Sequence, residues 1–346
     1  MPDQQRTVVM SDIHIGNGAA YSWFLPPYPD EVSAMFNQVA NDSNVEELVL
    51  LGDLFDLWLY PLDVVPWTVA QIVEKYPSIT QALRQCVHNK PHVYYMTGNH
   101  DMGVGIADLE PFSAGGNGIH LVTPDWYNAK YQNQRHLEHG HGVDMFNAQD
   151  KSRDTIGGYS LGFFITRLVA TAEDQSKVWR LLKELLQAFG AAHHAMGTAA
   201  MDVSLKGSFF VEAIITLLEK LAEVDDETRI RFSDPSLDNK YTVGDVKKHY
   251  GSLYDTWFER YPDPTEFVDT MLVGFLSTGL DWYGKKLLSR ANGPKVVVMG
   301  HTHHGESEDG YDNSGCWCIP SALGHGDATP NYVVIVGDKA TLVPWK

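Results

Sequence analysis

The sequence predicts a mixed α/β fold that carries one large, mainly helical insertion. Strand-like and helical patterns alternate over residues 1–145, helical patterns alone fill residues 146–291, and strand-like patterns return over residues 292–346. Alternating strands and helices are typical of a layered α/β core. We therefore predict a discontinuous core, 1–145 plus 292–346, with a helical insertion at 146–291.

The elements of the first core segment follow from their local patterns. The run EELVLLG at 46–52 is almost continuously apolar, as expected of a strand that is covered on both faces. The runs RTVVMSD and HVYYMTG have the same character. The predicted elements are strands at 6–12, 46–52, 92–98 and 135–140, a helix at 30–42 that begins at Asp30, and a helix at 66–89.

The insertion and the last core segment are interpreted in the same way. Long amphipathic patterns predict helices, and short apolar runs bounded by glycine predict strands. The helical runs lie at 178–190, 209–223 and 265–288, and the strands at 295–300, 316–320, 332–337 and 341–345.

The composition excludes some classes of protein. The formal charge of -18 argues against a binder of long nucleic acids, which needs clustered Lys and Arg. No apolar run reaches the ~18 residues of a membrane span, although the runs 160–172 and 209–222 leave a peripheral membrane contact open. The three cysteines include no CxxC pair and suggest reduced thiols, and the first residues lack the pattern of a signal peptide. We therefore expect a cytoplasmic protein.

Polar side chains that bind metals follow five of the predicted strands. Alone, each would be ordinary turn chemistry. Ligands bind at the carboxyl ends of strands in open α/β sheets, and the glycines beside these residues let side chains crowd together. Together, the five therefore predict a metal site. They are Asp12 and His14 in DIH, Asp53 and Asp56 in GDLFD, Asn99, His100 and Asp101 in GNHD, His139 and His141 in HGHG, and His301, His303 and His304 in GHTHHG.

This motif set resembles the calcineurin-like metallophosphoesterases. The family's D-x-H, G-D-x-x-D, G-N-H-D/E, His-Gly and G-H-x-H motifs are all present, and DNSGCW at 312–317 is similar to its Asn-x-Gly-x-Trp strand. The resemblance covers roughly 1–145 and 292–346 and implies a layered β-sandwich flanked by helices. DIHIG and GDLFDLW look closest to the UDP-2,3-diacylglucosamine pyrophosphatase branch. That branch usually has Arg in place of His100 and commonly Asp in place of His141, and it lacks so long an insertion.

The resemblance also implies two divalent metal ions. A mixed set of carboxylate, amide and imidazole ligands suits Mn, Fe, Zn or Co, of which we expect Mn. The family commonly uses the first histidine of such a pair, which favours His139 over His141. Two close metals share a water and lower its pKa, so that a bridging hydroxide attacks phosphorus in line. One metal is expected on Asp12, His14 and His303, the other on Asn99, His139 and His301, with Asp53 bridging the two.

The remaining polar residues of the motifs are expected to act beside the metals. His100 is not needed as a ligand, so we expect it to stabilise or protonate the leaving oxygen, with Asp101 holding its ring. Asp56 is expected to orient an imidazole through its free N–H. His141 and His304 are expected to lie just outside the ligands or to face the substrate.

The resulting prediction is a hydrolase of a phosphodiester or pyrophosphate bond. The expected partner is a small phosphorylated substrate, either nucleotide-linked or lipid-linked. A phosphomonoesterase on the same metals is the alternative. A non-catalytic scaffold would usually have lost ligands or the histidine of GNH, and this chain keeps both.

The insertion is expected to emerge at the rim of this site. It leaves the core soon after His139 and returns just before His301, which favours a cap over the metals. An oligomer interface and plain helical packing are the alternatives, and the sequence does not predict the oligomeric state. The aromatic runs at 21–29 and 58–67 either contact the substrate or pack under the insertion.

Overall fold

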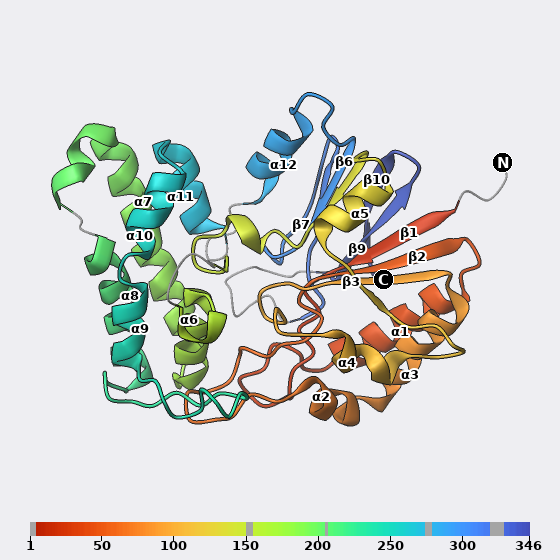
Figure 1. Ribbon diagram of the computed structural model, residues 1–346, viewed down its shortest axis with the longest axis horizontal. Coiled ribbons are helices and arrows are strands. Elements are labelled where there is room, and N and C mark those ends of the chain that lie inside the picture. The colour runs from red at the N-terminus through yellow and green to blue at the C-terminus, as the bar shows by residue number, and fades with distance from the viewer. Residues whose placement is uncertain (1–4, 150–154, 205–206, 274–278, 319–328) are drawn as a thin grey trace.

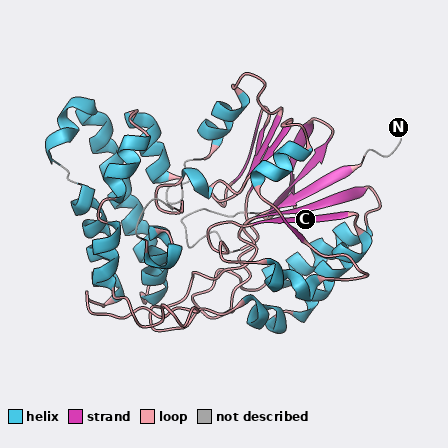
Figure 2. Ribbon diagram, viewed as in Figure 1, coloured by secondary structure: helices cyan, strands magenta, loops and turns pink. Residues whose placement is uncertain are grey.

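The molecule consists of a β-sandwich and a body of helices beside it (Figure 1). The structure is a computed structural model and describes residues 5–149, 155–204, 207–273, 279–318 and 329–346. Strands gather on one side of the molecule and the long helices of the insertion on the other, as Figure 2 shows. The predicted layered α/β fold with a helical insertion is confirmed.

The first sheet has six strands in the order β10-β9-β1-β2-β3-β4. β1 pairs in parallel with β2, and β2 with β3, so the carboxyl ends of these strands lie at one edge. Five of the six strands were predicted, with small shifts at their ends, and only the two-residue β4 was missed. The strands are β1 (Arg6–Met10), β2 (Val45–Leu51), β3 (His92–Met96), β4 (His120–Leu121), β9 (Asn331–Val336) and β10 (Lys339–Pro344).

The second sheet has four strands in the order β5-β6-β8-β7. They are β5 (Arg135–Leu137), β6 (Val296–Met299), β7 (Gly305–Glu308) and β8 (Tyr311–Ser314). The strand predicted at 316–320 is wrong for residues 316–318, and its last two residues lie outside the described part. β8 ends at Ser314 because Gly315 turns the chain with a φ of 68°. The N–H of Gly315 donates to Asn313 Oδ1 at 3.1 Å.

Helices cover the outer face of the first sheet. Phe36 of α1 (Tyr28–Asn41) and Leu83 of α3 (Pro77–Asn89) pack with Leu48 of the sheet in one buried apolar cluster. The single helix predicted at 66–89 is in fact two, α2 (Val69–Lys75) and α3, because Pro77 has no N–H to continue the first. Two short helices, α4 (Ile106–Leu109) and α5 (Pro124–Lys130), follow β3 and β4.

The two sheets face each other across a second apolar cluster, in which Val49 of β2 packs with Val298 of β6. One carboxylate, Glu47 of β2, is buried beside this cluster. It accepts hydrogen bonds from Thr7 Oγ1 and Tyr127 OH, each at 3.1 Å, and from Lys130 Nζ. Burial alone would raise the pKa of Glu47, but the hydrogen bond and charge of Lys130 outweigh it and lower the pKa.

We expect Glu47→Gln to lower the free energy of unfolding at pH 7 by about 1.5–3 kcal/mol, the usual worth of hydrogen bonds to a charged group. The pKa of Glu47 is lower in the folded state, so its contribution is present above the unfolded pKa of about 4.3. It is lost as the pH falls through the lower, folded pKa. Urea unfolding at several pH values should show the two proteins converging in acid. The neighbouring Glu46→Gln should have little effect at any pH, and an equal effect of both would contradict the prediction.

The insertion packs around one central helix, α6 (Leu161–Thr171), whose residues 161–170 are all buried. The burial leaves α6 no face for contact with lipid, and no described helix is both long and apolar enough to cross a membrane. The other helices are α7 (Gln175–Ser204), α8 (Gly207–Ala222), α9 (Val243–Tyr250), α10 (Leu253–Arg260) and α11 (Pro264–Leu272).

A buried arginine fastens the insertion to the core. Arg167 of α6 is fully buried and donates to the backbone carbonyls of Pro61 at 2.6 Å and Val64 at 2.8 Å. These carbonyls belong to the segment that follows the GDLFD motif. Trp23 and Trp58, from the aromatic runs of the core, are buried in the same apolar cluster as the insertion helices. These two tryptophans therefore pack under the insertion, whereas Trp67 of the second aromatic run lines a cavity.

The last helix of the predicted insertion lies on the core. The run at 265–288 forms α11 and a separate helix, α12 (Asp281–Leu288). Leu287 of α12 packs with Val297 and Met299 of β6 and covers the outer face of the second sheet. A Cβ at Gly284 would lie 2.5 Å from the ring of Tyr311, so glycine permits this close contact.

Candidate metal centre

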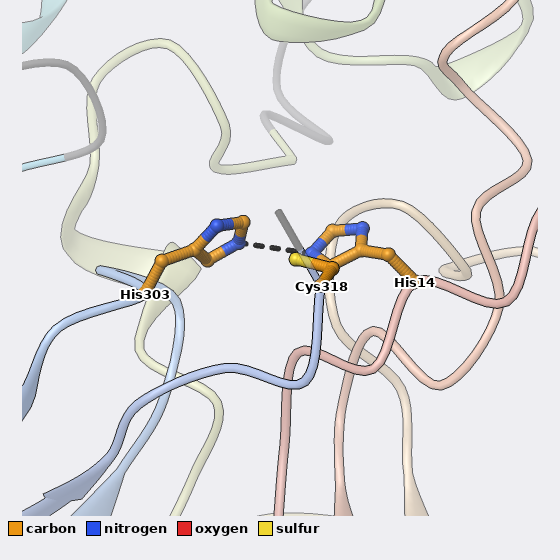
Figure 3. A group of neighbouring side chains, drawn as sticks. All are labelled: His14, His303 and Cys318. Atoms are coloured by element: carbon orange, nitrogen blue, oxygen red, sulfur yellow. Dashed lines mark hydrogen bonds between the residues drawn. The ribbon is translucent and has the colours of Figure 1, made fainter. Parts of the chain in front are cut away.

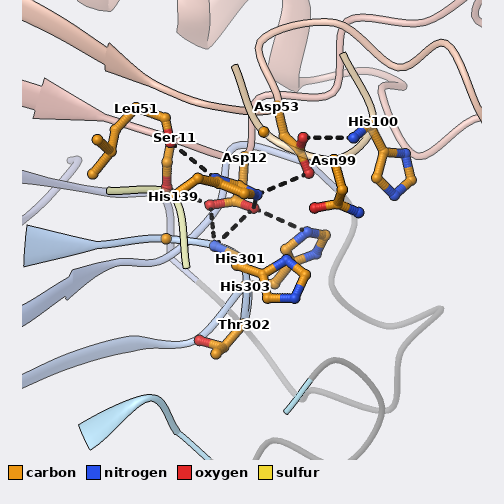
Figure 4. A network of polar contacts seen from close by, with 12 residues as sticks. Ser11, Asp12, Leu51, Asp53, Asn99, His100, His139, His301, Thr302 and His303 are labelled. Carbon is orange, nitrogen blue, oxygen red and sulfur yellow. Dashed lines mark hydrogen bonds and ion pairs between the residues drawn. The ribbon is translucent and has the colours of Figure 1, made fainter. Parts of the chain in front are cut away.

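Five strand ends bring the predicted ligands to one place, and Figure 4 labels six of the seven, all but His14. Asp12 and His14 follow β1, Asp53 follows β2, and Asn99 follows β3 of the first sheet. His139 follows β5, and His301 and His303 follow β6 of the second sheet. The site therefore joins the edges of both sheets. None of these seven side chains is more than 7% exposed.

The backbone at these strand ends is unusual. Asp12, His14 and Asp53 have φ angles of 53°, 54° and 53°, and His301 and His303 have 70° and 59°. Positive φ is costly for residues other than glycine and persists where the surroundings enforce it, often at functional sites. The tight turns aim successive side chains into a small volume.

Two glycines make room for this crowding. A Cβ at Gly98 would lie 2.1 Å from Asp53 Oδ1, and a Cβ at Gly52 would lie 2.5 Å from His139 Nδ1. Any larger residue at either position would displace a predicted ligand. The glycines of GDLFD and TGNHD thus allow neighbouring strand ends to lie close together.

The first group of ligands contains Asp12, His14 and His303. The two Nε2 atoms of His14 and His303 are only 2.9 Å apart, and His303 Nε2 is 3.3 Å from Asp12 Oδ1. The backbone N–H of His301 donates to Asp12 Oδ2 at 2.9 Å, and Ser11 Oγ donates to the same oxygen. Asp12 is thereby held with its Oδ1 toward both imidazoles.

The second group contains His139, His301 and Asn99. His139 Nδ1–H donates to the carbonyl of Leu51 at 2.9 Å, which leaves the Nε2 lone pair 3.2 Å from Asp53 Oδ2. His301 Nε2–H donates to Asp144 Oδ2 at 2.9 Å, so its Nδ1 lone pair is left for a metal. Fixing one ring nitrogen to aim the other is common among metal-binding histidines.

The amide of Asn99 is oriented in the same manner. Its Nδ2 donates to Asn147 Oδ1 at 3.3 Å, and Asn147 Nδ2 in turn donates to Asp144 Oδ2 at 2.7 Å. The Oδ1 of Asn99 is left buried without a hydrogen-bond partner. Asp144 and Asn147 were not predicted, since nothing in HGVDMFN distinguishes them and their partners His301 and Asn99 follow distant strands.

Asp53 lies between the two groups. Its Oδ2 is 3.6 Å from His14 Nε2 and 3.2 Å from His139 Nε2, while its Oδ1 accepts the backbone N–H of His100 at 2.8 Å. Burial opposes ionisation of Asp53, but the charge of His139 outweighs it and holds the pKa well below its usual range. One ionised carboxylate therefore serves both groups.

The site fits two divalent cations. The buried His139 Nε2 and Asn99 Oδ1 have no hydrogen-bond partner, although both lie among the carboxylates and imidazoles of the site. Burial alone would lower the pKa of His139, but the charges of Asp53 and Asp12 raise it to about 10. The two carboxylates thus make this position favourable for a positive charge, such as that of a metal ion. The donor set suits Mn, Fe, Zn or Co.

The prediction that Asp101 holds the ring of His100 is wrong. His100 Nδ1–H donates to Asp56 Oδ1 at 3.0 Å, and the ring stacks on Trp58 with centroids 4.7 Å apart. Asp101, predicted to hold this ring, instead accepts from the backbone N–H groups of Gly98 at 2.7 Å and Leu54 at 2.8 Å. Burial and the charge of Asp53 raise the pKa of Asp101 to about 6.

The other two histidines of the motifs, His141 and His304, lie at the margin of the metal site. The ring of His141 is half-buried, 5.5 Å from that of His139 between centroids, and His141 belongs to none of the groups whose donor atoms converge. His304 is exposed. The structure thus brings His139, and not His141, to Asp53.

Two cavities meet at His100. A cavity of about 30 Å³ is lined by Asp53, Asn99, His301 and His303 on the core side, and by Gly162, Thr166 and Trp179 of the insertion. A second cavity of about 210 Å³ is lined by Trp58, Trp67, Thr68, Met102, Asp108, Tyr159 and Ser233, among others. His100 lines both. The insertion therefore contributes walls to the space above the metal ligands.

Comparison with known proteins relates this chain to one family. Residues 5–165 match the family model of the calcineurin-like phosphoesterases, a range that ends inside α6 and does not reach His301 and His303. No curated protein matches. Among solved structures, the chain is similar to the crystal structure of Pseudomonas putida nuclease MPE, at 18% identity and a TM-score of 0.24. The match covers 38% of this chain and 53% of that one, about half its length. These two matches do not confirm the UDP-2,3-diacylglucosamine pyrophosphatase branch. The similarity to the calcineurin-like phosphoesterases is thus shown for residues 5–165, which contain Asp12, His14, Asp53, Asn99 and His139.

Proposed function

We propose that the chain hydrolyses a phosphodiester or pyrophosphate bond in a small substrate. One metal would be held by Asp12, His14 and His303, the other by Asn99, His139 and His301, with Asp53 shared between them. When bound, two such metals supply an activated water near neutral pH and positive charge beside the phosphoryl oxygens. Mn is the metal that we expect from this donor set as a whole.

The position of His100 carries the proposal. A phosphomonoester needs only the cavity above the metal ligands, whereas a diester or pyrophosphate has a second substituent to accommodate. The 210 Å³ cavity on the other side of His100 offers that space. Asp56 binds His100 at Nδ1, which leaves Nε2 to hold or donate a proton to the oxygen that leaves.

The lining of the second cavity favours a nucleoside-like group over an acyl chain. The half-buried Trp67 offers a flat surface for an aromatic ring, while Thr68, Asp108 and Ser233 add polar groups. The insertion would act as a cap, because Gly162, Thr166 and Trp179 line the cavity above the metals.

Hydrolysis by the Mn-loaded protein tests the proposal. We expect bis(p-nitrophenyl) phosphate to be cleaved with a higher kcat/KM than p-nitrophenyl phosphate. Trp67→Ala should then raise the KM for the diester and leave that for the monoester unchanged. Preference for the monoester would support a phosphomonoesterase in its place. Metal binding without turnover of either compound would contradict the proposal as it stands.

A further inference from the structure

A cysteine lies beside the first group of metal ligands. The sulfur of Cys318 and nitrogen atoms of His14 and His303 all lie within 4.8 Å of one another, and all three residues are buried (Figure 3). From the sequence, Cys316 and Cys318 would be packing residues beside Trp317. We propose that Cys318 is a ligand of the metal held by Asp12, His14 and His303, to which it adds a thiolate. This inference rests on the proposed metal site.

The segment after β8 aims Cys318 at this position. The backbone N–H of Trp317 donates to the carbonyl of Asp12 at 3.0 Å, which places the segment directly beside the first ligand. Trp317 packs with the helices on the first sheet, and its Nε1–H donates to the carbonyl of Asn331 at 2.7 Å. Cys316 and Cys318 pack instead in the cluster that contains Trp23 and the insertion helices. The two cysteines therefore lie on the metal side of the segment.

The two imidazoles independently indicate a cation here. Their Nε2 atoms are 2.9 Å apart, and the Nδ1 atoms of both His14 and His303 are buried without a hydrogen-bond partner. If one Nε2–H donates to the other ring, the accepting ring must carry its proton on a buried Nδ1 with no acceptor. A cation that takes both Nε2 lone pairs accounts for their close approach. The sulfur of Cys318 is a third donor at the same place.

A sulfur ligand changes which metal this position prefers. Thiolates select Zn, Fe or Co, whereas Mn prefers oxygen ligands. The thiol loses its proton to solvent as the metal–sulfur bond forms, so no oxidant or other co-reactant is required. We therefore expect the position of Cys318 to favour a softer ion than Mn, unlike the position of Asn99.

Absorption spectra of the Co²⁺-loaded protein test the inference without measuring activity. We expect a sulfur-to-cobalt charge-transfer band in the near ultraviolet. Cys318→Ser should remove the band. Cys86→Ser is the matched control and should keep it, because the buried Cys86 thiol donates to the carbonyl of Phe36 at 3.0 Å and belongs to no group of converging donors among the described residues. Bound cobalt without the band, or a band that survives Cys318→Ser, would overturn the inference and leave the proposed function standing.

Two further measurements test the inference even if Cys318→Ser fails to fold. X-ray absorption at the zinc edge of the unaltered protein should show a sulfur neighbour at about 2.3 Å. In competition, the ratio of bound Zn²⁺ to Mn²⁺ should fall at least about 10-fold in Cys318→Ala, the scale on which changes at a metal site act. A zinc spectrum with only nitrogen and oxygen neighbours would contradict the inference. Failure to bind any of these metals would overturn the inference and the proposed site together.

Discussion

Asp53→Asn is expected to lower kcat/KM for the diester by about 10²–10³-fold, the scale of losing a preorganised charge-stabilising group. Asp53 Oδ2 faces His14 on one side and His139 on the other, so both ligand groups depend on its charge. An amide offers one neutral oxygen and cannot serve both groups in the same way. Steady-state kinetics and elemental analysis of bound metal should show the two losses together.

The substitution should leave the fold intact. An amide oxygen at this position can still accept the hydrogen bond that Asp53 Oδ1 receives from the backbone N–H of His100. Asp42→Asn is a suitable control, since Asp42 lies next to the amino end of β2, away from the ligands, and pairs with Arg6 at 3.6 Å. A variant at Asp53 that keeps two bound metals and full activity would contradict the assigned role.

The metal-type residues that follow the strands could be predicted from the sequence because the patterns that mark them are local. Each predicted strand is followed by a metal-type side chain, with glycine directly before it in GD, GN and GH, and parallel strands place such ends at one edge. These local signals are sufficient to predict Asp12, Asp53 and His139 as ligands. It could not reveal the positive φ angles at Asp12 and Asp53, because those depend on neighbouring strands that press against each turn.

Contacts between distant segments were the part that could not be predicted. Asp144 holds His301, a residue 157 positions further along the chain, and no local pattern encodes such a pair. Adjacency in sequence also misled the assignment of Asp101 to His100. Asp101 Oδ1 accepts from the N–H of Gly98, three residues earlier, and Oδ2 accepts from the N–H of Leu54 and from Tyr95 OH, so both oxygens are already used. Asp56 is free to reach His100 because it lies on the neighbouring strand end.

His100→Gln is expected to lower kcat/KM for a diester by about 10²–10⁴-fold, the range typical of general acid–base catalysis. The loss should be larger for a phenyl ester than for a p-nitrophenyl ester, because a poor leaving group needs the proton more. Asp56→Asn should act in the same direction and more weakly, since it only positions the ring through Nδ1. Rates with both leaving groups, and the metal content of each variant, check these expectations.

The metal content of His100→Gln distinguishes a leaving-group role of His100 from a role as a metal ligand. If His100 served the metals, His100→Gln would lose bound metal and slow both esters equally, and that outcome would exclude the leaving-group role. His120→Gln, an exposed histidine of β4, is the matched control and should change neither rate. Because Asp56 acts through His100, the double variant should be no slower than His100→Gln alone. Additive losses would instead indicate that Asp56 also acts through His14, whose Nδ1 lies 3.9 Å from Asp56 Oδ2.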